Sequence, residues 1–340
     1  MSRFDTLKAT WFFTISKMNA RVPSRTAPYV PPPIPGTSKE HLRIVVTGGD
    51  GMVALALYEK HPEWTYLIDA MADLRDPVQT YSILRSAAPD IIVHLATVDC
   101  GMYARLKNAC NLLEDALLIN TNVVRAARRL GVRRFIAILE PGMYPEKAAV
   151  PYKEIDLHNG PPHASDSCRA VVERALHTHL KEAGFAYMCL VAPNLYGPYD
   201  TFDSDTSNVV AALITRAVEN TYVAVRGSGK TKRQFMYAPD FARILEWAVT
   251  SHVVGTFNVA APTDTGTAIS DVAKIVAQCA DLDESSITYN VAYEDGRQSK
   301  VVDAAMFEKH YGIDAYVRLR DGIHKTVAWY AARCIPRDAC

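Results

Sequence analysis

The stretch that decides the fold is Arg43-Ile-Val-Val-Thr-Gly-Gly-Asp-Gly-Met-Val-Ala54, an apolar run that enters a glycine-rich turn and then a helical pattern. Such a turn lets backbone N–H groups at the start of a helix approach a pyrophosphate, because Gly48 and Gly51 carry no side chain. Asp69 ends the next apolar run, near the offset of ~20 residues at which a carboxylate binds a ribose hydroxyl. The sequence therefore predicts a dinucleotide-binding fold that begins here.

Strand-like and helix-like segments alternate from residue 41 onward, which is typical of βαβ units. We therefore predict an α/β fold of the Rossmann type, with a doubly wound parallel sheet, a smaller α/β substrate lobe and an extended N-terminal arm. The expected parts are the arm at 1–40, the nucleotide-binding lobe at 41–193 and the substrate lobe at 194–340, with segments near 232–262 returning to the first lobe. Expected strands of the sheet span 42–47, 65–68, 90–96, 135–139 and 187–192, and expected helices span 52–60, 77–88, 112–130, 165–183, 206–219, 240–252, 269–280 and 303–310.

The composition narrows the classes of function. Among 340 residues, 37 Lys and Arg balance 37 Asp and Glu, so the overall charge does not indicate nucleic acid as a partner. The seven cysteines include no Cys-x-x-Cys pair, which favours a reducing compartment and predicts no bound metal. No apolar run approaches the ~18–20 residues of a membrane helix. We therefore expect a cytoplasmic protein without a membrane span.

The first forty residues differ from the rest of the chain. They carry six Lys and Arg against two Asp and Glu, and they combine an aromatic cluster at Trp11-Phe-Phe13 with a proline-rich stretch at 21–36. One interpretation is a disordered tail or a transit peptide to the mitochondrial matrix. The other is an arm that docks on an acidic protein surface in a large assembly, such as the cytoskeleton or an axonemal microtubule.

A series of short motifs follows the first turn: Asp73-Leu74, His94-Leu-Ala96, His158-Asn-Gly-Pro-Pro-His163, Asn194-Leu-Tyr-Gly-Pro198, Lys232-Arg-Gln-Phe-Met-Tyr237 and Asp295-Gly296. In order and spacing these motifs resemble the GDP-L-fucose synthase family of extended short-chain dehydrogenases/reductases, over about residues 42 to 330. The resemblance implies a Rossmann lobe, a sugar-nucleotide lobe and a homodimer formed by helices. In that family NADPH reduces a GDP-keto-sugar after epimerisation at two carbons.

The family's catalytic positions hold other residues in this chain. Matching the motifs places Arg169 and Glu173 at the Tyr and Lys positions, Glu140 at the Ser position, Gly142 at the Cys position and Tyr199 at the His position. Each of the lost groups ordinarily contributes ~10²–10⁴-fold to the rate. The substitutions therefore predict that the chemistry is lost. Arg169 and Glu173, four residues apart on one helix, are expected to pair on a solvated or reused surface and not in a preserved pocket.

The binding positions are better preserved. The resemblance assigns cofactor contacts to Gly48, Gly51, Met52, Asp69, Asp73, Leu95 and Ala96, and substrate contacts to Asn194, Arg233 and Lys300. A carboxylate at Asp69 suits the 2′-hydroxyl of NAD(H) and repels the 2′-phosphate of NADP(H). We expect no cofactor to be required, with NAD(H) or NADP(H) at most a structural ligand. Alternatively, the glycines remain only because the turn needs them.

Three functions compete at this point. The leading one is a pseudoenzyme, a structural or scaffolding subunit of a larger assembly. The second is an active NAD(P)-dependent sugar-nucleotide epimerase or reductase that uses displaced groups, with Tyr103 or Tyr199 as the acid and Glu140 as the base. The third is a regulator that senses NAD(H). The spacing of Tyr103 and Lys107 matches the family's Tyr-x-x-x-Lys pattern, but it follows the third strand instead of the fourth, so we do not expect Tyr103 to replace the catalytic Tyr.

Overall fold

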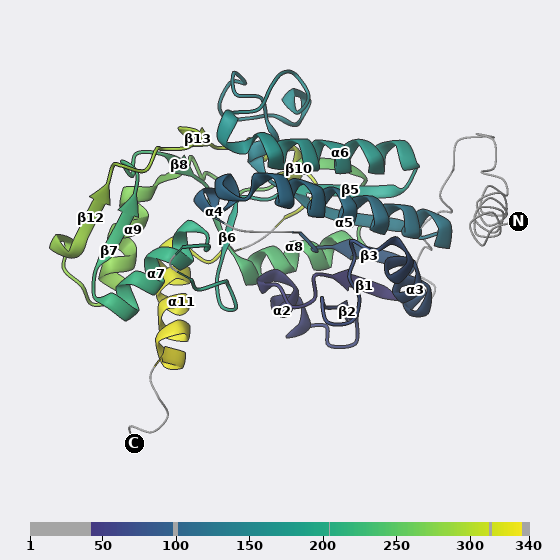
Figure 1. Ribbon diagram of the computed structural model, residues 1–340, viewed down its shortest axis with the longest axis horizontal. Helices are drawn as coiled ribbons and strands as arrows, with labels where there is room; N and C mark the ends of the chain where they lie inside the picture. The colour runs from purple at the N-terminus through teal and green to yellow at the C-terminus, as the bar shows by residue number, and fades with distance from the viewer. Residues whose placement is uncertain (1–41, 98–100, 204, 313–314, 335–340) are drawn as a thin grey trace, which may run out of the picture. The chain divides into compact units, whose positions relative to one another are not determined.

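The computed structural model describes residues 42–97, 101–203, 205–312 and 315–334 (Figure 1). The predicted arm at 1–40 lies outside these ranges, so its interpretations as an address label or a docking segment stay predictions. Within the described ranges, no helix is both long and apolar enough to cross a lipid bilayer. The same ranges contain no cluster of three or more His, Cys, Asp or Glu side chains suited to a metal ion.

A six-stranded parallel sheet forms the centre of the first lobe. Its strand order is β10-β5-β4-β3-β1-β2, and each neighbouring pair is parallel. The bounds are β1 Ile44–Thr47, β2 Thr65–Leu67, β3 Ile91–His94, β4 Arg134–Leu139, β5 Ala186–Val191 and β10 Gly255–Asn258. The predicted Rossmann-type sheet is confirmed, and its sixth strand comes from the segment near 232–262.

Helices cover both faces of this sheet (Figure 1). The helices around the sheet are α2 Met52–Tyr58, α3 Pro77–Ala87, α5 Ala109–Leu130, α6 Ser167–Ala183 and α8 Ala238–Thr250. Alternate residues of β1 point to opposite faces, so Val45 packs with Val123 and Leu180 from α5 and α6, whereas Val46 packs with Leu57 and Phe241 from α2 and α8. Burial on both faces explains why the strands read as continuous apolar runs.

The second lobe is smaller and is built on short strands. The bounds are β6 Asn194–Tyr196, β7 Val223–Arg226, β8 Lys232–Arg233, β9 Phe235–Tyr237, β11 Thr267–Ala268, β12 Ile287–Asn290 and β13 Ser299–Lys300, with helices α4 Met102–Lys107, α7 Val209–Asn220, α9 Ile269–Cys279 and α11 Leu319–Cys334. The short helix α10 Ala305–Glu308 instead packs on the main sheet through Phe307. Strand β7 pairs with β12, and β8 lies between β11 and β13. A separate apolar cluster, which includes Leu213, Val276 and Ile323, holds α7, α9 and α11 together.

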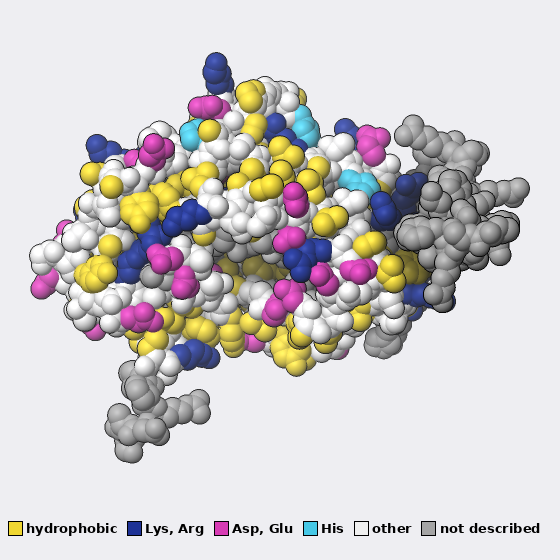
Figure 2. Space-filling view, in the orientation of Figure 1, with side chains coloured by type: hydrophobic (Ala, Val, Ile, Leu, Met, Phe, Trp, Pro, Cys, Tyr) yellow, Lys and Arg dark blue, Asp and Glu magenta, His cyan; other side chains and the backbone are white. Residues whose placement is uncertain are grey.

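Basic and acidic side chains are interspersed over the face of the molecule shown in Figure 2. This mixture agrees with the balance of charges in the sequence.

Candidate active site

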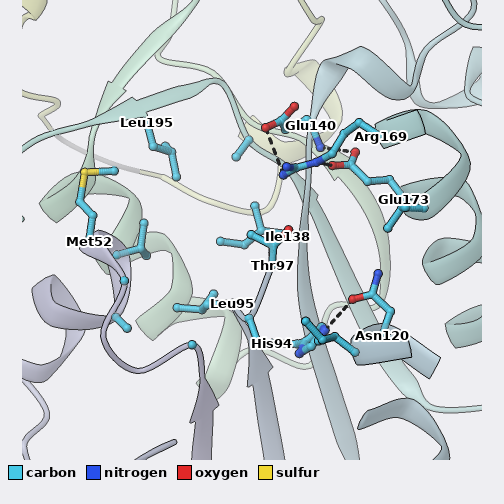
Figure 3. A pocket seen from close by; sticks show the side chains of 18 of the residues that line it. Met52, His94, Leu95, Thr97, Asn120, Ile138, Glu140, Arg169, Glu173 and Leu195 are labelled. Atoms are coloured by element: carbon cyan, nitrogen blue, oxygen red, sulfur yellow. Dashed lines mark hydrogen bonds and ion pairs between the residues drawn. The ribbon is translucent and has the colours of Figure 1, made fainter. Parts of the chain in front are cut away.

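A cavity of about 810 Å³ opens at the carboxyl ends of the strands of the main sheet. Its walls include the residues that follow β1, β3 and β4, namely Gly48, Leu95 and Glu140. Open α/β sheets bind their ligands at this edge. In Figure 3, Met52, Leu95 and Leu195 lie toward one side of the cavity, and charged side chains around Glu140 lie toward the other.

The glycine-rich turn borders this cavity and needs glycine for two different reasons. Gly48 has a φ of +68°, and a Cβ there would lie 2.7 Å from the backbone N of Ala96, so a side chain has neither the conformation nor the room. At Gly51 a Cβ would meet only the Gly48 carbonyl oxygen, at 3.3 Å. The first glycine therefore lets the turn pack against the end of β3, and the second leaves space above the turn.

His94 is the last residue of β3, and its buried side chain lines the cavity and is held by two hydrogen bonds. Its Nδ1 lies 2.8 Å from Oγ1 of Thr47, and its Nε2 lies 3.0 Å from Oδ1 of Asn120. The Thr47 hydroxyl oxygen also accepts a hydrogen bond from the backbone N–H of Ala96 at 3.2 Å. Burial lowers the pKa of His94 to about 4, so the imidazole is neutral and acts as a link between β1, β3 and α5.

Three charged side chains, Glu140, Arg169 and Glu173, form what we call the charged cluster (Figure 3). Glu140 follows β4, and the other two lie one turn apart on α6. The Arg169 Nε donates to Oε1 of Glu173 at 2.6 Å, and its Nη2 lies 3.1 Å from Oε1 of Glu140. The second oxygen of Glu173 accepts the backbone N–H of Glu140 at 2.7 Å. One guanidinium thus joins two carboxyl groups at the cavity wall.

The expected solvated helix face is wrong for this pair. The side chains of Arg169 and Glu173 are only 13% and 5% exposed, and both line the cavity. The helical period correctly places them on one face of α6. That face points into the cavity and not to solvent, since Val172 and Leu176 of the same helix line the cavity as well.

The two carboxyl groups of the charged cluster have different environments. Burial raises the pKa of Glu173 to about 7, and the negative charge of Glu140 adds to this effect. Burial also acts on Glu140, but the positive charges of Arg169, Arg105 and Lys300 outweigh it and lower the pKa of Glu140 to about 2. Pairs of carboxyl groups whose pKa values are shifted in opposite directions are typical of sites that use one acid and one base.

A second hollow of about 160 Å³ adjoins the first cavity. Glu140, Asn194 and Lys300 line both spaces. Four arginines add further positive charges to the smaller hollow, against two additional carboxylates: Arg105, Arg216, Arg226 and Arg233, with Asp205 and Asp295. The arrangement offers a cationic chamber beside a larger cavity, with Glu140 in the wall between them.

The two tyrosines that were considered as displaced acids lie apart. Tyr199 lines the larger cavity and donates to Oε1 of Glu59 at 3.1 Å, which raises the pKa of Tyr199. Tyr103 lines the smaller hollow and donates to the backbone carbonyl of Glu294 at 3.0 Å. Burial raises the pKa of Tyr103. Because both hydroxyls are weaker acids than usual, neither is the better proton donor of the site.

The remaining sequence-predicted residues fall into three groups. Those assigned to the cofactor all line the larger cavity: Gly48, Gly51, Met52, Asp69, Asp73, Leu95 and Ala96. Asn194 and Lys300 line both spaces, and Arg233 lines the smaller hollow. Gly142 is buried in the turn Pro141–Met143, where a Cβ would lie 3.1 Å from Cγ of Asp166.

Sequence reasoning did not identify Arg105, Asn120 and Asp166. The Lys300 Nζ donates to Oδ1 of Asp166 at 2.6 Å, and Nη1 of Arg105 lies 3.8 Å from Oε2 of Glu140. Asn120 had a usable signal, since it is polar within the apolar side of a long helix. The other two come from a short helix and a 3-10 turn, and the sequence carries no local sign that these segments meet.

Residues 44–260 match the NAD dependent epimerase/dehydratase family, and the chain belongs to this family of enzymes. It is 28% identical over 311 residues to the probable GDP-L-fucose synthase of Drosophila melanogaster, covering 85% of this chain and 97% of the relative. It is 30% identical over 216 residues to the GDP-L-fucose synthase of Azorhizobium caulinodans, covering 60% of this chain and 69% of the relative. A GDP-L-fucose synthetase from Naegleria fowleri bound to NADP shares the fold, with a TM-score of 0.78 and 23% identity over 92% of this chain and 98% of that one.

These relatives confirm the resemblance and correct the leading function. The interpretation of the chain as an inactive scaffolding subunit is wrong, because relatives that match most of its length are named as synthases. The leading prediction took replacement of all five catalytic positions as loss of every proton-handling group. The structure places other ionisable side chains, Arg169 and Glu173, in the cavity at those positions.

Proposed function

We propose that this protein is an NAD(P)-dependent enzyme that reduces or epimerises a nucleoside-diphosphate sugar. The observation that carries the proposal is the pair of adjoining cavities, one large and one cationic, which share Glu140, Asn194 and Lys300. A hydride donor and a sugar must meet at such a shared wall. The charged cluster stands at this wall, where protons are needed.

The residues of the larger cavity fit a nicotinamide dinucleotide. The turn at Gly48 admits no Cβ, the space above Gly51 is free of contacts except for one carbonyl, and the exposed carboxylate of Asp69 lines the cavity beyond β2. Such a glycine turn and carboxylate suit a pyrophosphate and a ribose hydroxyl. A bound nicotinamide supplies or accepts the hydride, and the protein supplies the binding surface and the proton.

The smaller hollow fits the anionic half of a sugar nucleotide. Its lining has five cationic side chains, Arg105, Arg233 and Lys300 among them, and three carboxylates, so positive charge is in excess and a diphosphate carries the complementary charge. The names of the relatives suggest a guanosine diphosphate sugar as the first substrate to test.

The test is turnover of a GDP-keto-sugar by the purified full-length chain, with NADH and NADPH in parallel reactions. We expect loss of the reduced nicotinamide absorbance together with formation of the reduced sugar. Epimerisation is followed separately, as uptake of deuterium from heavy water at the sugar carbons. The proposal is contradicted if no nucleoside-diphosphate keto-sugar causes oxidation of the reduced nicotinamide and none takes up deuterium.

Asp69 is expected to make the protein prefer NAD(H) over NADP(H). Its carboxylate accepts a hydrogen bond from a 2′-hydroxyl and repels a 2′-phosphate, so we expect a difference in Kd of about tenfold, or ~1.4 kcal/mol. Calorimetry should show this preference in the natural chain and its loss in Asp69→Ala. Asp50→Asn is the matched control, because Asp50 lines the same cavity and its loss should change both affinities alike. Tighter binding of NADPH by the natural chain would contradict the assignment.

A further inference from the structure

We propose that Glu173 carries the transferable proton of this site, and that Glu140 stays ionised across the guanidinium of Arg169. The inference rests on the proposed function and names the acid that replaces the family's tyrosine. In this chain two carboxyl groups and one guanidinium would perform the task of a hydroxyl and an ammonium group.

The geometry distinguishes the two carboxyl groups. Glu140 is 31% exposed and meets three cations, since Arg169 Nη2 and Arg105 Nη1 lie 3.1 Å and 3.8 Å from its oxygens and Lys300 lines the same hollow. Glu173 is 5% exposed and has Arg169 as its only ion-pair partner among the described residues. A proton shared within the cluster therefore resides on Glu173, where ionisation gains least from neighbouring charge and loses most from burial.

The hydrogen bonds leave room for that proton. A carboxyl group offers about four lone-pair sites. In the structure each oxygen of Glu173 uses one of these sites, for the Nε of Arg169 and the backbone N–H of Glu140. The remaining sites accept a proton without breaking either bond. Cys189 of β5 also faces this carboxyl group, and burial keeps its thiol uncharged by raising the pKa of Cys189.

The proposed step balances. In the reducing direction the carbonyl π bond of the sugar breaks, its carbon gains a hydride with two electrons, and its oxygen gains the proton of Glu173. An alcohol forms, and Glu173 is left as a carboxylate that takes a proton from water. In the oxidising direction the carboxylate of Glu173 receives the alcohol proton, and the carbon loses its hydride with two electrons to the oxidised nicotinamide that the proposed function supplies. Burial that raises the pKa of Glu173 to about 7 suits both directions near neutral pH.

Infrared spectroscopy of the full-length chain tests where the proton resides without any substrate. Below pH 7 we expect the C=O band of a buried carboxylic acid that disappears above pH 7. The band should be absent in Glu173→Gln and unchanged in Glu182→Gln, an exposed carboxyl group on the same helix. In Glu140→Gln the band should persist but titrate at lower pH, because a neighbouring negative charge is gone. A band that survives Glu173→Gln, or that Glu140→Gln removes, would overturn the proposal.

The pH dependence of stability gives a second readout with a definite sign. Because the folded pKa of Glu173, about 7, exceeds the unfolded value of 4.5, the native state holds more protons between these values. Its stabilising contribution is complete below pH 4.5 and is lost as the pH rises through 7. The Tm of Glu173→Gln minus the Tm of the natural chain should therefore be larger above pH 7 than below pH 4.5. A Tm difference that does not change with pH would contradict the proposal, even in a chain that proves active.

Discussion

Glu140→Gln is expected to lower kcat for the sugar substrate several-fold near pH 7, because loss of its negative charge lowers the pKa of Glu173 and leaves less of the transferable proton on that side chain. Glutamine keeps the shape of the side chain and an oxygen that accepts from Arg169. It removes the negative charge in the wall shared by the two cavities. Since Glu140 is already ionised at neutral pH, with a pKa of about 2, its own titration does not contribute there. The loss should be largest near pH 7 and should shrink at lower pH, where Glu173 is protonated in both proteins.

The measurement is a steady-state pH profile with a matched control. Glu146→Gln removes an exposed carboxyl group six residues farther along the chain and should leave kcat unchanged. Glu173→Gln, in contrast, removes the proposed proton donor and should lower kcat by about 10²–10⁴-fold and flatten the limb of the profile near pH 7. If Glu140→Gln retains the natural kcat, the charge in the shared wall has no part in the reaction.

The cofactor half of the site was predictable because its signals are local. The turn around Gly48 is specified by consecutive residues, and Asp69 follows the next strand at a known offset. Alternation of strand and helix patterns predicted the sheet. The structure shortens the second predicted helix, which ends at Ala87 because Ala88 adopts a left-handed conformation. Such shifts leave the positions of the site residues unchanged.

The charged cluster was only half predictable. The spacing of Arg169 and Glu173 places them together on one helix face, but spacing does not say whether that face meets solvent or a cavity. The answer depends on β4, which brings Glu140 to the same point, and that meeting is a property of the packed fold. Comparison with the family's motifs shows which catalytic groups are absent, but it does not show what the replacing side chains can do.

The ion pair between Asp166 and Lys300 shows the same limit, because its partners are 134 residues apart. We expect Asp166→Ala to lower the free energy of unfolding by about 3–5 kcal/mol, since it leaves a buried ammonium without its partner. The side chains of Asp166 and Lys300 are only 1% and 12% exposed. Arg105 also lies 3.9 Å from the same Asp166 oxygen, so loss of the carboxylate leaves the charges of Lys300 and Arg105 to repel each other. Glu182→Ala, exposed on α6, serves as the control and should change stability little.

A double substitution distinguishes the charge from the packing. Asp166→Asn and Lys300→Met should each destabilise the fold, because each removes the nearest ion-pair partner of a buried charge. Together they remove both charges, so the double variant should be more stable than the sum of the two single losses predicts. Urea unfolding of the four proteins gives the coupling free energy directly, as the difference between the double loss and that sum. Additive losses would mean that Asp166 and Lys300 act through separate contacts and that their ion pair adds nothing to the stability of the fold.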